Sequence, residues 1–464
     1  MAITASTTFR GPNLSLVQSA FRSVLAKRGI AATPADPGTA AVPPSPATPG
    51  TPAAPATLGT TAATHIGGPH PQTEDFNTAL DALSNGQPVP ATVSDGSPLD
   101  TCAKLGAELA WAKITGNDAR VAQLEGDLKF GACDPFWAEV TAEYAAFTLS
   151  KKAIPYRSCN GDMTAFMLPL PDPDAGGLRI AVIADWGTGT ADAARLLAAA
   201  LAESPHAIIH LGDIYYSGTQ DEMNGNFLQV MKSAGVTVPV YTLAGNHDMY
   251  SGGAGYYWLL DQLAQPASFF CLRNDSWQFL AMDTGYHDSD PDTVDTNITS
   301  LEPSEALWHQ DKIANAGGRK TVLFSHHQLF TFAETCGSLN GVEQAVNPRL
   351  QATFGPAIAN GQIACWLWGH EHNFIVYQPF LGLNISACVG AGALPVLVGD
   401  NPYGVNPKLQ NTPPFIPTAI LQNDGTTYCH SFALVTLNGA AGRVDYIQID
   451  GSGKRVPGTY SQTF

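Results

Sequence analysis

Cysteine is scarce in this sequence of 464 residues, and the few cysteines are far apart. No two of the eight form a C-x-x-C pair, which excludes a zinc ribbon and a thioredoxin-type motif. Eight cysteines in a chain of this length are also too few for a disulfide scaffold. Cys365 and Cys388 stand within apolar runs, so we expect buried thiols at both positions.

Basic residues are in short supply as well. Lys and Arg number 23 against 40 Asp and Glu, which gives a formal net charge of −17. A surface of this sign disfavours general nucleic-acid binding, which needs a basic footprint, so we expect no nucleic-acid partner. A phosphate ligand is still compatible with the charge, because a bound metal ion can invert the local field.

Long apolar runs are missing too. No run approaches the ~20 residues of a membrane-spanning helix, so we expect no transmembrane segment. The first ten residues have neither the basic start nor the apolar core of a secretory signal. The default expectation is a cytoplasmic protein, with export by another route as the alternative. Apolar residues still make up 44 %, which predicts a globular chain with a full hydrophobic core.

Composition divides the chain into four regions. Residues 1–30 include a short amphipathic helix over Asn13–Arg28, which favours docking to a protein partner; a membrane-surface or export role is the alternative. Residues 31–72 interleave Pro with Ala, Thr and Gly and predict an extended linker. Helical spacing in residues 73–165 predicts a helical accessory region, and residues 175–464 form the main domain.

The main domain alternates β-rich apolar runs with helical patterns, which predicts an α/β fold. The β-rich runs are Leu178–Ala184, Ala207–Leu211, Val238–Ala244, Trp277–Met282, Thr321–Ser325 and Ile363–Trp368. Helices are expected at about 191–203, 219–234, 304–315 and 348–360. The last third is more purely β, with runs at Phe374–Phe380, Leu383–Val389, Ser431–Leu437 and Val444–Ile449.

Five polar clusters each follow one of these predicted strands. They are Asp185-Trp186-Gly187, Gly212-Asp213-Ile214-Tyr215-Tyr216, Gly245-Asn246-His247-Asp248, Ser325-His326-His327 and Gly369-His370-Glu371-His372. Any one of them alone is typical of a turn, a helix cap or a core residue. Because the carboxyl ends of strands in α/β sheets converge on one crevice, we expect all five to lie close together.

Such a crevice predicts bound metal ions. The aspartates Asp185, Asp213 and Asp248 could not all stay ionised there without a compensating cation. Mixed nitrogen and oxygen ligands suit zinc, iron or manganese. The ligands outnumber what one ion needs, so two ions that share a carboxylate fit better. Alternation along a strand would place His370 and His372 on the same side.

The ordered clusters resemble the motifs of the metallophosphoesterase (calcineurin-like) superfamily, and within it those of the purple acid phosphatases. Generic members begin with D-x-H, whose histidine is a ligand, but here that position is Gly187. The purple-acid-phosphatase pattern replaces this ligand with the tyrosine of G-D-x-x-Y, which here is Tyr216. The resemblance covers about residues 177–395 and implies a four-layer sandwich of two mixed β-sheets flanked by helices.

The resemblance implies a ligand set for two metal ions. The ligand that bridges both ions would be Asp213. The first ion, ferric iron in this family, would be completed by Asp185, Tyr216 and His372. The second ion, typically zinc, iron or manganese, would be completed by Asn246, His326 and His370. The implied reaction is hydrolysis of a phosphate monoester by a metal-bound hydroxide.

Two further histidines are candidate catalytic residues. His247 follows the ligand position Asn246, so it can point into the crevice and protonate the leaving group or stabilise the phosphoryl group. His327 is a second candidate, although it could instead point away from the metals. His287 and the acidic run that begins at Asp288 predict a solvated loop.

Some positions depart from the family pattern. Plant members have further histidines nine and ten positions after the equivalent of His326, where this chain has Thr335 and Cys336, and Gln328 stands where many relatives have Pro. A phosphodiesterase or phospholipase of the same superfamily is therefore an alternative, and so is a non-catalytic metal- or phosphate-binding module. We expect the spans 217–235 and 331–347 to line the crevice and set substrate size.

Overall fold

The computed structural model describes residues 152–464, except 172, 291, 292, 294, 295, 397, 399, 400, 426 and 459, together with Ala82 and Phe147. The chain divides into two compact units, one of residues 1–21 and 125–464 and one of residues 22–124. The fold below belongs to the first unit. The predicted N-terminal helix, the linker and most of the helical accessory region lie outside the described residues.

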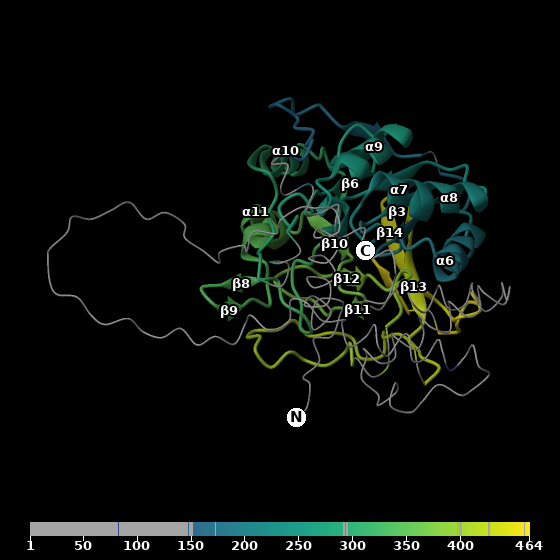
Figure 1. The fold of residues 1–464 in the computed structure, drawn as a ribbon. Helices are drawn as coiled ribbons and strands as arrows, with labels where there is room; N and C mark the ends of the chain where they lie inside the picture. The colour runs from purple at the N-terminus through teal and green to yellow at the C-terminus, as the bar shows by residue number, and fades with distance from the viewer. Residues whose placement is uncertain are drawn as a thin grey trace, which may run out of the picture. The chain divides into compact units, whose positions relative to one another are not determined.

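A sheet of seven strands runs through one side of the fold (Figure 1). Its order is β1-β5-β6-β7-β10-β12-β11, and its strands are β1 Met167–Pro169, β5 Phe270–Arg273, β6 Trp277–Ala281, β7 Lys320–Ser325, β10 Ile363–Trp368, β12 Ser386–Val389 and β11 Phe374–Val376. The central strands β6, β7, β10 and β12 are parallel, whereas β11 pairs antiparallel with β12. The sheet also takes in β1, which precedes the predicted start of the main domain at residue 175.

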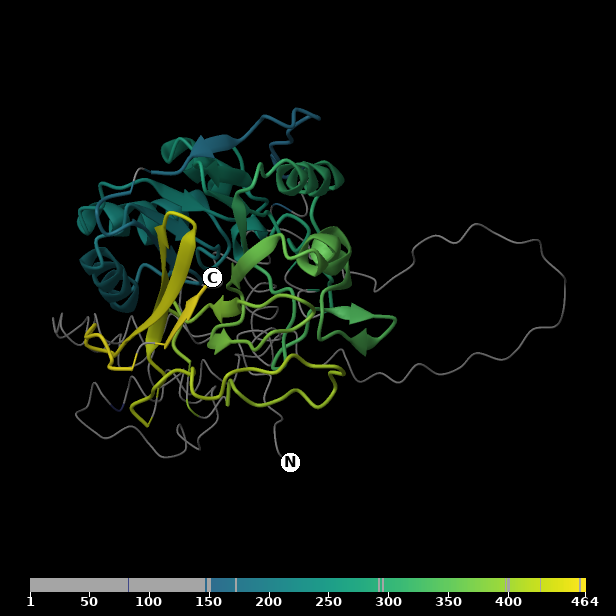
Figure 2. The same cartoon turned by 180° about the vertical axis from the view of Figure 1, so that it is seen from behind.

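A second sheet of six strands packs against the first. Its order is β15-β14-β13-β2-β3-β4, and its strands are β15 Tyr460–Thr463, β14 Ala441–Ile449, β13 His430–Asn438, β2 Leu178–Ile183, β3 Ala207–His210 and β4 Val240–Thr242. Strands β2, β3 and β4 are parallel, and the long hairpin of β13 and β14 joins them antiparallel. This hairpin is the yellow ribbon in the rear view (Figure 2).

Side-chain alternation along the strands produces the layers. In β2, Ile180 and Val182 lie in the core between the two sheets, together with Phe324 of β7. The intervening Ala181 and Ile183 face the opposite way, into a second core beneath the helices. A residue period of two therefore gives each sheet two buried faces, which explains why its strands are almost continuously apolar.

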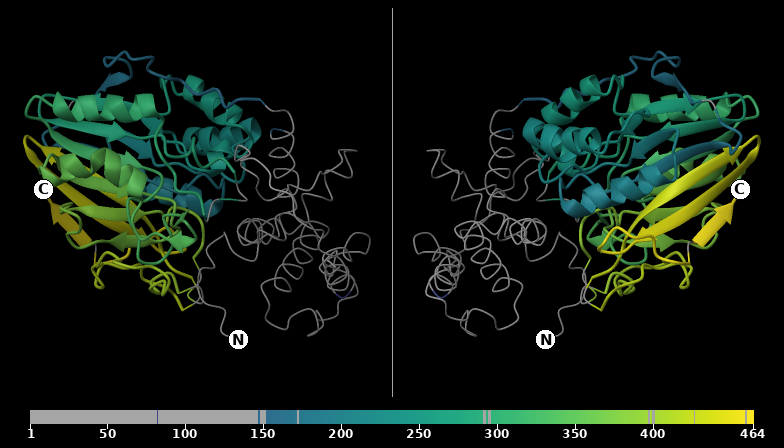
Figure 3. Two further views of the ribbon diagram at one scale, coloured as in Figure 1. Left: turned by 90° about the vertical axis from the view of Figure 1, so that its left-hand side faces the viewer. Right: turned by 90° about the vertical axis from the view of Figure 1, so that its right-hand side faces the viewer.

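Helices cover both outer faces, so the sheets lie between two helical layers (Figures 1 and 3). The six-stranded sheet is covered by α6 Ala191–Ala202, α7 Gln220–Glu222, α8 Gln229–Ser233 and α9 Ala254–Gln262. The seven-stranded sheet is covered by α10 Pro303–Ala314 and α11 Pro348–Ala359. In the described part of the chain, no helix is both long and apolar enough to cross a membrane.

The structure confirms the predicted fold class and most of the predicted elements. The helix expected at 219–234 forms, but a π-helical segment, Met223–Leu228, separates α7 from α8. Helix α9 was missed because its residues are apolar on nearly every side, so no 3.6-residue period is visible. The small hairpin of β8 Ser338–Leu339 and β9 Val342–Glu343 was also missed, because two-residue strands carry no readable alternation.

A group of buried polar side chains joins α10 to the end of β6. The carboxyl of Glu305 accepts hydrogen bonds from the Asp283 backbone N–H (2.8 Å) and the Tyr156 hydroxyl (3.0 Å), and His309 Nε2 lies 3.2 Å from it. Burial raises the pKa of Glu305 to about 8. Burial, with the nearby charge of Glu305, also raises the pKa of Asp283 to about 7. Glu305 therefore keeps its proton at neutral pH in the folded chain.

This group predicts that stability falls as pH rises. An unfolded glutamate has a pKa near 4.3, so between about pH 5 and 8 the folded chain holds a proton at Glu305 that the unfolded chain has released. The free energy of unfolding should then fall by about 1.4 kcal/mol per pH unit from this residue alone, and stop falling above pH 8. Glu305→Gln, which cannot ionise, is expected to remove that slope.

Urea unfolding of the full chain at several pH values between 5 and 8 measures the effect. The control is Asp221→Asn, which removes an exposed carboxyl and should keep the wild-type slope. Parallel profiles for wild type and Glu305→Gln would show that the interpretation of Glu305 is wrong.

Candidate metal centre

The five polar clusters follow strands from both sheets. Asp185, Asp213 and Asn246 come after β2, β3 and β4 of the six-stranded sheet, whereas His326 and His370 come after β7 and β10 of the seven-stranded sheet. The two sheets pack face to face, so the carboxyl ends of these parallel strands meet at one end of the sandwich. The crevice is therefore shared between two sheets rather than confined to the edge of one.

Sharp turns aim these side chains into the crevice. Asp185, Asp213 and His370 all have a left-handed backbone, with φ of 52°, 71° and 72°. Non-glycine residues adopt this conformation at a cost of order 1–3 kcal/mol, and such residues cluster at functional sites. The neighbouring glycines are needed for space: a Cβ at Gly369 would lie 2.5 Å from Asp185 Oδ2, and one at Gly245 would overlap the Asp213 carboxylate.

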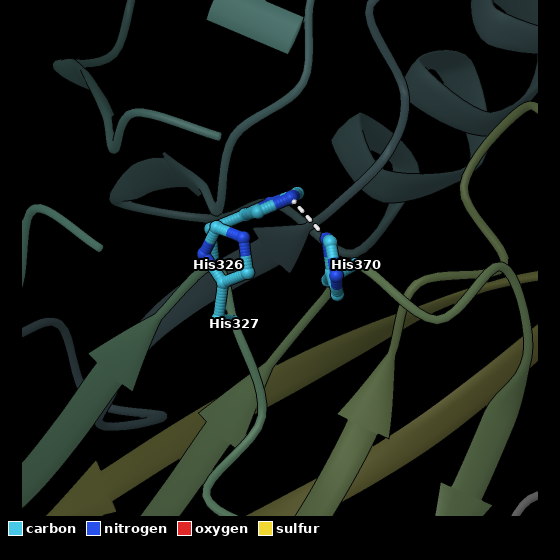
Figure 4. A group of neighbouring side chains, drawn as sticks. All are labelled: His326, His327 and His370. Carbon is cyan, nitrogen blue, oxygen red and sulfur yellow. Dashed lines mark hydrogen bonds between the residues drawn. The ribbon is translucent and has the colours of Figure 1, made fainter. Parts of the chain in front are cut away.

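Hydrogen-bond acceptors converge around His326 Nε2. This atom lies 3.1 Å from Asn246 Oδ1, 3.1 Å from His370 Nδ1 and 3.4 Å from Asp213 Oδ1. Figure 4 shows the rings of His326 and His370, which meet edge to face at 77°, with the contact between them dashed. All four residues are buried.

The surrounding contacts decide which of these atoms carry protons. His326 Nδ1 lies 2.9 Å from the Leu211 carbonyl, which can only accept, so the ring proton sits on Nδ1 and Nε2 presents a lone pair. The amide nitrogen of Asn246 donates to the Tyr250 hydroxyl (2.5 Å), which turns its oxygen toward His326. Two imidazole nitrogens, an amide oxygen and a carboxylate oxygen thus lie around one point of the crevice. A cation is the group that satisfies such a set.

A second group of ligand atoms lies around Asp185. The Tyr215 hydroxyl donates to Asp185 Oδ1 (3.1 Å) and lies 3.1 Å from His372 Nε2, which is itself 3.6 Å from Asp185 Oδ1. The resemblance assigns the tyrosine here to Tyr216, whereas the structure brings Tyr215 to Asp185 and His372. Carboxylate and phenol oxygens are hard ligands of the kind that suit Fe(III).

The electrostatics of the crevice are also compatible with a bound cation. Burial raises the pKa of Asp213 well above its usual value, and the charges of Asp185 and Asp248 raise it further. Burial, followed by the charges of Asp185 and Asp213, likewise raises the pKa of Tyr215. Metal ions would hold these groups ionised by replacing the lost solvation with direct coordination. The residues present therefore fit a metal centre.

Asp248 does not belong to this centre, although the sequence grouped it with Asp185 and Asp213. Its Oδ2 accepts the backbone N–H of Asp213 (2.9 Å) and of Gly245 (2.7 Å), and its Oδ1 accepts that of Ile214 (3.0 Å). Three peptide dipoles, rather than a cation, thus face its carboxyl group. The interaction ties the turn after β3 to the turn after β4, and so sets the position of Asp213.

The sequence predicted that His370 and His372 occupy alternate positions of one strand, but the structure places them outside any strand. They lie in the irregular turn between β10 and β11, and the left-handed backbone of His370 reverses the chain there. As a result they point to different groups: His370 faces His326, whereas His372 faces Asp185 and Tyr215. The prediction that both enter the crevice agrees with the geometry, but its reason was wrong.

Both candidate catalytic histidines are held at the crevice. His247 Nδ1 lies 2.6 Å from the Tyr216 carbonyl, so Nδ1 carries the proton. The ring centroid of His327 is 4.1 Å from that of His370, so His327 does not point away from the cluster (Figure 4). His327 Nδ1 also lies 2.9 Å from the Thr284 hydroxyl.

Sequence reasoning missed the partner of His327. Asp288, expected in a solvated loop, is buried, and its Oδ2 lies 2.8 Å from His327 Nε2. Its Oδ1 accepts from the Asn297 amide (2.9 Å). Nothing in the local sequence distinguishes Asp288 from the other acidic residues of the run. The neighbouring His287 is half-buried and lies 3.3 Å from Glu302 Oε1 instead.

The positions that depart from the plant pattern also lie at the crevice. Thr335, Cys336 and Gln328 line a small pocket together with His327 and His370. The structure thus confirms that part of the span 331–347 lines the crevice. Thr335 and Cys336 thus bring a hydroxyl and a thiol to the positions where the plant pattern has histidines.

The contacts of Asp248 predict a purely structural effect. Asp248→Asn keeps the size but leaves one acceptor oxygen for three backbone N–H groups, so the buried network loses charge-assisted hydrogen bonds. We expect the free energy of unfolding to fall by about 2–4 kcal/mol, measured by urea unfolding in the presence of a chelator. A midpoint equal to that of wild type would contradict the role given to Asp248.

Comparisons with known proteins agree with this geometry. Residues 178–374 match the sequence model of the family described as Calcineurin-like phosphoesterase, and all five polar clusters fall inside this range. No curated protein matches the chain.

Several solved structures are similar at low identity. Purple acid phosphatase PPD1 from yellow lupin (Lupinus luteus) seeds is 14 % identical with a TM-score of 0.41, and the match covers 63 % of this chain and 55 % of that one. PhoD is 13 % identical with a TM-score of 0.43, covering 63 % and 70 %. GAP50, the anchor in the inner membrane complex of Plasmodium, is 14 % identical with a TM-score of 0.39, covering 61 % and 87 %. The chain thus spans little more than half of the lupin protein. The family match over residues 178–374 shows that this chain carries a calcineurin-like metallophosphoesterase domain.

Proposed function

We propose that the domain is a dinuclear-metal phosphoester hydrolase of the purple-acid-phosphatase type that acts on phosphate monoesters. The observation that carries the proposal is the convergence of imidazole, amide and carboxylate groups around His326 Nε2, because zinc, iron and manganese bind this combination of nitrogen and oxygen ligands. The family match supports hydrolysis of a phosphoester.

The ligand set follows from the two groups of donor atoms. Asp213 contacts His326 of one group and Tyr215 of the other, and would bridge two ions. Asn246, His326 and His370 would hold a divalent ion, zinc, iron or manganese, because imidazoles and a neutral amide suit it. Asp185, His372 and a tyrosine, Tyr216 by the resemblance, would hold Fe(III). A pair of such ions supplies an activated water and polarises the phosphoryl oxygens of the substrate.

The histidines would act on the substrate rather than on the metals. Because His247 Nδ1–H is hydrogen-bonded to the Tyr216 carbonyl, Nε2 is the atom that would hold the second proton of the imidazolium form and donate that proton to the departing alkoxide. His327 is the second candidate, and its contacts to Asp288 and Thr284 hold its ring against His370. Protonation of the leaving oxygen matters most when that oxygen is strongly basic.

Removal of the bridging carboxylate tests the centre. Asp213→Asn is expected to lower metal content and to reduce turnover by more than about 100-fold, because both ions lose a ligand. The full chain would be purified with iron, zinc and manganese supplied separately, and assayed for metal and for hydrolysis of p-nitrophenyl phosphate and its diester analogue. Asp221→Asn, an exposed carboxyl, is the control.

The outcomes separate the alternatives. Monoester turnover that depends on Asp213 supports the proposal. Preference for the diester would indicate a phosphodiesterase of the same superfamily. Bound metal without turnover of either ester would contradict the hydrolase and favour a binding module.

Leaving-group dependence tests the histidines. His247→Asn should lower kcat for an alkyl phosphate by roughly 100-fold or more, but should affect p-nitrophenyl phosphate much less, because p-nitrophenolate departs without a proton. Metal content should remain that of wild type. If His327→Asn shows this selectivity and His247→Asn does not, the assignment of the proton donor to His247 is wrong.

A further inference from the structure

Two consecutive tyrosines follow Asp213, and the motif and the geometry point to different ones. The spacing G-D-x-x-Y assigns the metal ligand to Tyr216. In the structure, the hydroxyl that lies 3.1 Å from both Asp185 Oδ1 and His372 Nε2 belongs to Tyr215. Tyr215 is also almost fully buried, at 2 % exposure. The Tyr215 hydroxyl therefore lies beside Asp185 and His372, the two residues that the resemblance assigns to the first ion.

Contacts from the next helical turns hold this segment of the chain. The Asn226 amide donates to the Tyr215 carbonyl (2.8 Å). The Glu222 carboxylate accepts the backbone N–H groups of Tyr216, Ser217 (3.2 Å) and Thr219 (2.9 Å). These bonds anchor the backbone that follows Tyr215, and on the other side the Tyr215 N–H donates to the Gly187 carbonyl (2.9 Å), so the fold directs the Tyr215 ring.

Tyr216 has a different set of contacts. Its carbonyl oxygen lies 2.6 Å from His247 Nδ1 and so orients the ring of His247. The rings of Tyr215 and Tyr216 meet edge to face, with centroids 6.0 Å apart, and the Tyr215 ring also lies 4.8 Å from that of His247. The contribution of Tyr216 to the crevice thus comes from its main chain, whereas that of Tyr215 comes from its hydroxyl.

We propose that Tyr215, and not Tyr216, supplies the phenol oxygen that binds the first metal ion. The tyrosine ligand then stands two positions after Asp213 instead of three, and Tyr216 positions His247 through its carbonyl group. This inference rests on the proposed dinuclear function. On binding, the phenolic proton is released to solvent and the oxygen lone pair takes its place on the metal.

A matched pair of variants tests the assignment by absorption spectroscopy. A tyrosine oxygen bound to Fe(III) gives a strong visible charge-transfer band, which none of the other ligands produces. The full chain is loaded with ferric iron and zinc, and absorbance is normalised to the iron measured in the same sample. Tyr215→Phe is expected to lose the band, whereas Tyr216→Phe is expected to keep it. Both substitutions retain the ring, so packing changes little.

Each outcome has a distinct meaning. Loss of the band in Tyr216→Phe with retention in Tyr215→Phe overturns the inference and leaves the proposed function intact. Iron-loaded wild type without a visible band overturns the inference too, because no tyrosine is then bound. Wild type that binds no metal overturns the proposed function itself. If Tyr215→Phe does not fold, the band of Tyr216→Phe still decides the question: a retained band supports Tyr215, and a lost band refutes it.

Discussion

The crevice depends on one electrostatic constraint, which is that buried carboxylates lie beside imidazoles and an amide oxygen, away from solvent. His326 Nε2 meets an amide oxygen, a carboxylate and a second imidazole, and its own ring proton is committed to the Leu211 carbonyl. Buried carboxylates are costly without a compensating charge, and a bound cation stabilises their ionised form. The sharp turns, the glycines and the left-handed residues around it all serve to bring these atoms together.

The scaffold meets this constraint by using the ends of two sheets. Parallel strands β2, β3 and β4 present oxygen ligands, whereas β7 and β10 present imidazoles, so the two kinds of ligand come from opposite sides. The Asp248 carboxyl group then connects the turn after β3 to the turn after β4 by accepting hydrogen bonds from three backbone N–H groups. A buried carboxylate with such partners is a rigid support, and it positions Asp213 without competing for the metals.

Much of the fold was readable from the chain. Continuous apolar runs predicted doubly buried strands, and helical periodicity placed α6, α10 and α11 within one or two residues. The failures were elements whose side chains show no period. Helix α9 is apolar on most sides, and the missed strands β1, β5, β8, β9 and β15 have at most four residues each, too few for a readable alternation. The hydrophobic pattern of a short segment cannot reveal a helix or strand whose formation depends mainly on tertiary packing.

The candidate site, like the fold, was predictable from the sequence only in part. The sequence alone determined which residue types gather, because a polar residue directly after a buried strand must lie at the end of the sheet, and Asp185, Asp213, Asn246, His326 and His370 all do so. Tertiary structure decided how each is used. Asp248 became a support, Asp288 a partner of His327, and Tyr215 rather than Tyr216 came to face Asp185 and His372. Those outcomes depend on hydrogen bonds between residues tens of positions apart or more, and no local spacing encodes them.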